Sequence, residues 1–138
     1  MEYSFLAYKE QFDKDEFARA AGIELSEASP GYAKATMEVT ARHLNSVGTL
    51  HGGAIFTLAD FVFAVASNAH GKIAMAIETE ISFFKAVRTG RITAVAREIS
   101  LHEKLGTYLV DITDESGAPV AHFKGTAYRR NEYINYQK

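Results

Sequence analysis

Near the start of the chain, the pattern of apolar and polar residues is typical of a helix. Residues 8–21 are therefore predicted to form a short helix. Asp13 and Glu16 stand at the spacing of a capping box, in which side chains satisfy free backbone N–H groups at a helix start. Gly22 follows as the expected C-terminal stop, because glycine commonly ends helices.

The longest apolar run covers residues 54–66. It predicts a helix from about Gly53 to Ala69, ending near Gly71, that is apolar nearly all round and therefore buried. The run is too short to span a bilayer, and it contains one carboxylate, Asp60. An unpaired carboxylate in apolar surroundings is costly, so Asp60 needs either a hydrogen-bonding partner or a function.

Strict alternation of apolar and polar residues marks residues 32–40 as a half-buried strand, because strand side chains point to opposite faces in turn. Four further strand-like segments follow the apolar helix, separated by turn signals: 73–86, 91–101, 107–114 and 119–129. Connections this short favour antiparallel neighbours, so we expect these four strands to form a meander.

A single helix that is apolar on nearly every side is best buried by a sheet that wraps around it. The predicted order is a short helix, one strand, the long apolar helix and four strands. Residues 1–138 are the length of one ordinary domain. We therefore expect a single α+β domain, with an antiparallel sheet wrapped around one long central helix.

Composition and charge narrow the function classes. The formal net charge is −2 and the Lys and Arg residues are scattered, so neither nucleic acid nor a membrane surface is an expected partner. The absence of cysteine excludes disulfides and thiolate chemistry and fits a cytoplasmic location. Apart from His51, the histidines show no metal-ligand spacing, and no metal or cofactor is expected. The N-terminal segment has early acidic residues and no continuous apolar core, unlike a signal peptide.

The segment that enters the apolar helix carries the most specific motif of the chain. It reads Asn-x-x-Gly-x-x-His-Gly-Gly and is followed by Leu-Ala-Asp; its positions are Asn45, Gly48, His51, Gly52, Gly53, Leu58, Ala59 and Asp60. This motif and the order of elements resemble the acyl-CoA thioesterases of the hot-dog fold, in particular the phenylacetate-degradation (PaaI-like) group.

The resemblance implies hydrolysis of a thioester carried by coenzyme A. It implies a homodimer that extends the sheet and often pairs again into a homotetramer. By residue, it implies Asp60 as the catalytic carboxylate, Gly52 as a backbone N–H donor to the thioester carbonyl, and Asn45 as a polar group beside the attacked carbon. The expected substrate is a medium-chain or aromatic, phenylacetyl-like acyl-CoA.

The same chemistry is consistent with the residues taken alone. Thioester hydrolysis needs an activated water or an attacking carboxylate, and a group that holds the oxyanion. A helix N-terminus offers free N–H groups and the positive end of the helix dipole. Gly52 and Gly53 let a ligand carbonyl approach that backbone closely, and Asp60 supplies the carboxylate.

The spacing of these residues predicts a shared site. Gly52 and Asp60 are eight residues apart, which is roughly 12 Å along one helix axis at about 1.5 Å per residue. A base and an oxyanion donor must both lie within a few ångströms of the reacting atoms. We therefore expect Asp60 of one chain to act with Gly52 and Asn45 of a second, which predicts a dimer with two equivalent interfacial sites.

Four further residues are expected at or beside the substrate. His51 is expected chiefly to organise the loop, and Gly53 to let the substrate approach the helix backbone closely. Phe61 follows Asp60 and is expected to line the acyl pocket. Glu78, in the strand after the helix, either polarises the site or pairs across the dimer.

Other readings remain open for the same residues. Asp60 is alternatively a structural acid bonded to a hydroxyl such as that of Thr57, and Asn45 a turn residue. Hydratases of this fold resemble an Asp followed five residues later by His, whereas this chain has Val65 there. The second function considered is a non-catalytic acyl-CoA binding or sensing protein.

Overall fold

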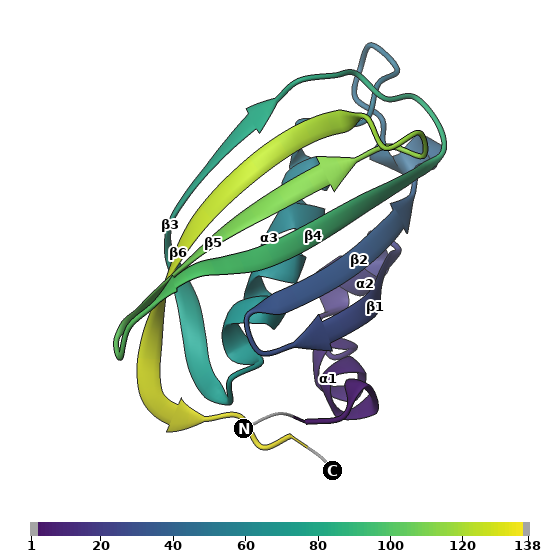
Figure 1. The fold of residues 1–138 in the computed structure, drawn as a ribbon. Coiled ribbons are helices and arrows are strands. Elements are labelled where there is room, and N and C mark those ends of the chain that lie inside the picture. The colour runs from purple at the N-terminus through teal and green to yellow at the C-terminus, as the bar shows by residue number, and fades with distance from the viewer. Residues whose placement is uncertain (1–2, 137–138) are drawn as a thin grey trace.

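The computed structural model describes residues 3–136 and contains one six-stranded sheet and three α-helices. The elements are α1 (Phe5–Phe12), α2 (Glu16–Ala20), β1 (Ile23–Ser29), β2 (Tyr32–Glu38), the 3₁₀ helix η1 (Ala41–His43), α3 (Gly52–Asn68), β3 (Lys72–Phe83), β4 (Arg91–Leu101), β5 (Leu105–Thr113) and β6 (Pro119–Tyr133). The strand order is β1-β2-β4-β5-β6-β3, and every neighbouring pair is antiparallel. Figure 1 shows the sheet curling along one side of α3. The predicted architecture is confirmed.

The central helix α3 begins and ends within one residue of its predicted bounds. Its side chains fill the concave side of the sheet, and Leu58, Val62 and Val65 are fully buried. Phe63 packs on β6 where Gly125 has no side chain. A Cβ at Gly125 would lie 2.8–3.0 Å from the Phe63 ring. This glycine therefore lets the helix and the sheet approach closely.

The single N-terminal helix predicted for residues 8–21 is wrong. Two short helices occupy this region, and each has its own N-cap: Ser4 accepts from the Ala7 N–H of α1, and Asp15 from the Ala18 N–H of α2. Asp13 is the C-cap of α1, so it does not form the predicted capping box. Gly22 does follow α2 as expected, with a positive φ of 80°.

Strand β1 was not predicted. Ile23 and Leu25 point into the core, but the alternation then breaks at an irregularity between Leu25 and Glu27. The next strand, β2, matches its prediction, with Ala33 and Ala35 fully buried.

The predicted four-strand meander is also wrong, because β3 does not pair with β4. It pairs instead with β6, where Ile81 lies opposite Phe123, so only β4, β5 and β6 form a meander. The chain leaves the sheet after β3 and contacts the loop that enters α3, where the Leu50 N–H donates to the Val87 carbonyl at 2.7 Å. As a result β3 is an edge strand, and its Met75 and Ile77 side chains are 56% and 61% exposed.

Within residues 3–136, no helix has the length and apolar character needed to cross a lipid bilayer.

Candidate active site

The N-terminus of α3 presents one backbone N–H without an acceptor. His51 is the N-cap, and its Nδ1 accepts from the Gly53 N–H at 2.8 Å. The N–H groups of Ala54 and Ile55 both donate to the His51 carbonyl. Among the described residues, the Gly52 N–H alone of these first four has no recorded hydrogen bond. It lies at the positive end of the helix dipole, where an anionic oxygen is stabilised.

The loop before this helix is shaped by Asn45. Its Oδ1 accepts from the N–H groups of Val47 and Thr49, both at 3.1 Å, and its Nδ2 donates to the Thr49 hydroxyl at 2.9 Å. Gly48 completes the turn with a positive φ of 79°, a conformation that favours glycine. The interpretation of Asn45 as a turn residue is confirmed, and its role beside the substrate stays a prediction.

Asp60 lies two turns into α3 on the least buried side of the helix, in line with Gly53, Thr57 and Ala64. Its carboxylate has no hydrogen bond or ion pair within the described part of the chain. The Thr57 hydroxyl, suggested as a structural partner, donates instead to the Gly53 carbonyl at 2.8 Å. Burial raises the pKa of Asp60 above its ordinary value, and the negative charge of Asp15 adds to the increase.

Four of the predicted site residues lie together in the structure, and Asp60 lies apart from them. Asn45, His51, Gly52 and Gly53 lie together at the entry to α3. Asp60 is on the same unbroken helix, eight residues and roughly 12 Å further along its axis. The carboxylate and the free N–H of one chain therefore do not meet.

The two remaining predicted residues lie apart from this cluster. Phe61 is buried and packs edge-on against Phe12 of α1, with ring centroids 6.3 Å apart. Glu78 is exposed on the edge strand β3, opposite Thr126 of β6. Their roles at the substrate stay predictions, because neither contacts the α3 entry in the single chain.

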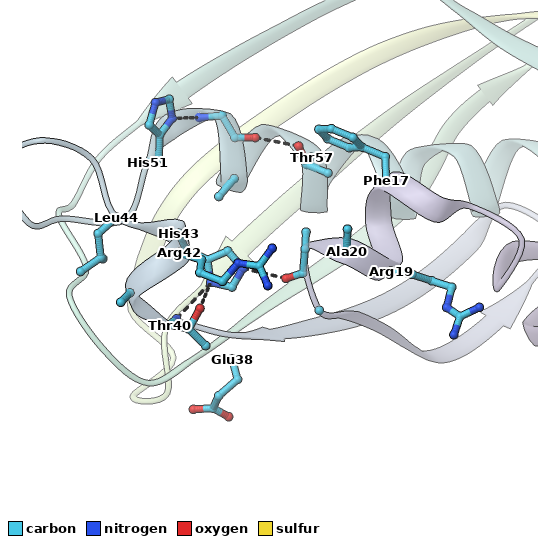
Figure 2. A pocket seen from close by; sticks show the side chains of 15 residues that line it. Phe17, Arg19, Ala20, Glu38, Thr40, Arg42, His43, Leu44, His51 and Thr57 are labelled. Carbon is cyan, nitrogen blue, oxygen red and sulfur yellow. Dashed lines mark hydrogen bonds between the residues drawn. The ribbon is translucent and has the colours of Figure 1, made fainter.

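A pocket of about 710 Å³ opens beside the first half of α3. Figure 2 shows its two walls: one from α3, where His51 and Thr57 lie, and one from α2, which carries Phe17. The end of β2 and η1 complete the lining. Its volume is within the range of about 300–1,000 Å³ that small-molecule sites occupy.

Sequence reasoning missed this pocket's far wall. Phe17 and His43 belong to segments outside the motif, and neither has a neighbouring residue pattern that signals a site. The Thr40 N–H donates to His43 Nδ1 at 3.0 Å, which leaves the proton on Nε2, and Nε2 donates to the Ala21 carbonyl at 2.7 Å. His43 thus ties η1 to the end of α2.

No group of three or more His, Cys, Asp or Glu residues within residues 3–136 is arranged to hold a metal ion. The candidate chemistry consists of a carboxylate, a free backbone N–H and a pocket.

Comparison with known proteins gives consistent results. The chain matches the thioesterase superfamily over residues 47–121. A candidate esterase of Archaeoglobus fulgidus is 42% identical over 122 residues, which cover 88% of this chain and 79% of that protein. The acyl-coenzyme A thioesterase PaaI of Escherichia coli is 35% identical over 119 residues, covering 86% and 85%. The solved structure of E. coli PaaI, from the phenylacetic acid degradation operon, has a TM-score of 0.90 and 32% identity over 95% of this chain and 96% of that chain.

Proposed function

This chain belongs to the thioesterase superfamily and has its hot-dog fold, and we propose that it hydrolyses medium-chain or aromatic, phenylacetyl-like acyl-CoA to the free acid and coenzyme A. In this reaction water adds to the thioester carbonyl, the carbon–sulfur bond breaks, and coenzyme A leaves as the thiol. PaaI of E. coli, a relative that aligns over most of this chain, is named as an acyl-coenzyme A thioesterase.

The observation that carries the proposal is the unpartnered carboxylate of Asp60. It is partly buried, its pKa is raised by that burial, and no donor among residues 3–136 is bonded to it. A structural carboxylate in such a place would be hydrogen-bonded, because desolvation without compensation is costly. A general base needs an available carboxylate whose pKa lies closer to the working pH.

The oxyanion of the tetrahedral intermediate is proposed to bind at the entry to α3. The Gly52 N–H is the donor, because among the described residues it is the one N–H of the first turn of α3 that has no acceptor. The Gly53 N–H already donates to His51, so His51 supports the site by fixing the first turn of the helix. Asn45 is proposed to act through the loop it shapes and to lie beside the attacked carbon.

Because Gly52 and Asp60 of one helix are roughly 12 Å apart, we propose that each site combines Asp60 of one chain with Gly52 and Asn45 of another. The unpaired edge of β3, with Met75 and Ile77 exposed, supports pairing with a second copy that extends the sheet. A homodimer of this kind is isologous and holds two equivalent sites. Further pairing into a homotetramer, and a cytoplasmic location, stay predictions.

Asp60 acts either as a general base on water or as a nucleophile that forms an anhydride with the acyl group. A single turnover in ¹⁸O-water, with enzyme in excess, identifies the nucleophilic route in which water cleaves the anhydride at the Asp60 carbonyl. The general-base route puts ¹⁸O into the product acid at once. If the carboxylate attacks and water then cleaves the anhydride at the Asp60 carbonyl, the first acid formed carries an Asp60 oxygen and ¹⁸O stays on the protein.

The proposed function is tested by release of free coenzyme A from acetyl, medium-chain, long-chain and phenylacetyl thioesters. We expect turnover, with the best kcat/KM on a medium-chain or phenylacetyl substrate. Binding of these thioesters without any turnover would instead support a non-catalytic acyl-CoA binding or sensing protein. A best rate on acetyl-CoA or on long chains would contradict the substrate class.

A further inference from the structure

The pocket beside α3 lies next to the proposed reaction site. Gly53 and Thr57 line it, on the side of the helix that also carries Asp60, which serves the other site of the proposed dimer. Gly53 also follows Gly52, the proposed oxyanion donor, directly in the chain. A group attached to a carbonyl at the α3 entry therefore has this pocket beside it.

The far wall of the pocket combines one large aromatic residue, Phe17, with Arg19 and with small residues. Ala20 and Ala21 of the α2 region and Ala54 of α3 also line the pocket, and their small side chains take up little of it. Phe17 stands above them, and Figure 2 places its ring near Thr57. The Phe17 residue is 74% exposed, so its ring is free to pack on a ligand.

The wall that carries Phe17 is fixed in place. Asp15 caps the start of α2 through the Ala18 N–H at 3.0 Å, and Ala18 is buried against the core. At the other end, His43 donates to the Ala21 carbonyl at 2.7 Å. A wall held at both ends can discriminate between ligands by shape, because it does not yield to fit them.

This wall lies outside the part of the chain that matches the superfamily. The match covers residues 47–121, whereas Phe17 and Ala20 belong to α2.

We propose that this pocket receives the acyl group and that Phe17 selects acyl groups that carry an aromatic ring. The inference rests on the proposed thioesterase function and narrows its substrate class. Two aromatic rings packed edge-on or offset gain about 0.5–1.5 kcal/mol beyond their buried area, which corresponds to a rate factor of about 2 to 10. A linear chain of the same carbon number lacks that term.

The test compares phenylacetyl-CoA with octanoyl-CoA, whose acyl groups have the same number of carbons, and uses acetyl-CoA as a reference too small to fill the pocket. Phe17→Leu keeps an apolar side chain but removes the ring. Phe5→Leu is the matched control, because Phe5 is also exposed but lies on α1 and does not line the pocket. Size-exclusion chromatography and melting temperature establish that both variants keep the wild-type assembly and fold.

In Phe17→Leu we expect the ratio of kcat/KM for phenylacetyl-CoA to that for octanoyl-CoA to fall about 2- to 10-fold, with acetyl-CoA unchanged. Phe5→Leu should keep the wild-type ratio. An unchanged ratio in Phe17→Leu would overturn the proposal. So would an equal loss on all three substrates, or a change in assembly, because each places Phe17 at the coenzyme A moiety or at a subunit contact.

A binding measurement keeps the inference separate from the proposed function. Phenylacetate, the free acid, is titrated into the protein while amide NMR shifts are recorded. We expect shifts at Ala20, Ala54 and Thr57 in the wild type that weaken in Phe17→Leu. If no thioester turns over but these shifts appear, the proposed function fails and the pocket assignment stands. If thioesters turn over and the shifts are absent, the pocket assignment fails alone.

Discussion

The shared site makes a quantitative prediction about mixtures of two inactive variants. Asp60→Asn removes the carboxylate and keeps its shape. Gly52→Pro removes the proposed N–H donor at the first position of α3, where proline is tolerated, and His51 before it already has the extended ψ of 135° that proline favours. A Cβ at residue 52 would lie 3.3 Å from Cζ of Phe83, which is half exposed, so its ring can shift and the fold should be kept. Each variant alone should lose about 10²-fold or more of the wild-type rate.

The recovery expected on mixing follows from the helix geometry. Roughly 12 Å along α3 separates the two residues, so each site draws them from different chains. Random reassociation of equal amounts gives about half heterodimers, and each heterodimer holds one intact and one doubly altered site. The mixture should therefore reach about a quarter of the wild-type rate at the same total protein concentration.

The assay is coenzyme A release after the two variants are mixed, partly unfolded and refolded together. A matched control mixes wild type with the double variant in equal amounts. If sites are shared, both sites of every heterodimer are damaged and about a quarter of the rate should remain. If each chain holds a whole site, every heterodimer keeps one intact site and about half of the rate should remain. No recovery in the first mixture together with half the rate in the control would refute the two-chain site.

Three further predictions concern Asp60 and the core. Burial raises the folded-state pKa of Asp60 above its ordinary value of 3.8, so the folded state binds this proton more tightly than the unfolded state does. The protein therefore loses stability as the pH rises from 3.8 through the raised pKa. Asp60→Asn should consequently melt higher than wild type at pH 7, with the difference vanishing in melts below about pH 3.8; a lower melting temperature at pH 7 would contradict the burial argument. The acid limb of the kcat/KM profile should have a pKa above that ordinary value, because the base must be ionised, and titration at or below 3.8 would point to another group. Gly125→Ala should lower the free energy of unfolding by about 1–3 kcal/mol, measured with denaturant, because its Cβ would meet the Phe63 ring. Adding Phe63→Leu should restore part of the loss. An equal loss with and without Phe63→Leu would show that the two positions do not interact.

The long apolar run explains why α3 could be predicted closely. A continuous apolar stretch of this length, entered through Gly52 and Gly53, fits only a buried helix, and its burial requires the sheet to surround it. The role of Asn45 as a turn residue could likewise be predicted, because an Asn three residues before Gly48 bonds its own local backbone.

Other features depend on contacts that no local pattern records. β1 was missed because Ser26 and Glu27 interrupt its alternation at a bulge. The pairing of β3 with β6 is non-local, and a period of two does not specify the partner strand. The pocket's far wall depends on His43 of η1 reaching Ala21 at the end of α2, a contact between residues that are far apart in the sequence.

The most direct measurement is the rate of coenzyme A release by wild type and Asp60→Asn side by side, on the best thioester of the panel. Asparagine keeps the shape of the side chain but serves neither as base nor as nucleophile. The account predicts turnover in the wild type and a fall of about 10²- to 10⁴-fold in Asp60→Asn, with the fold intact. A variant that keeps the wild-type rate would show that Asp60 takes no part in the chemistry and would contradict the account.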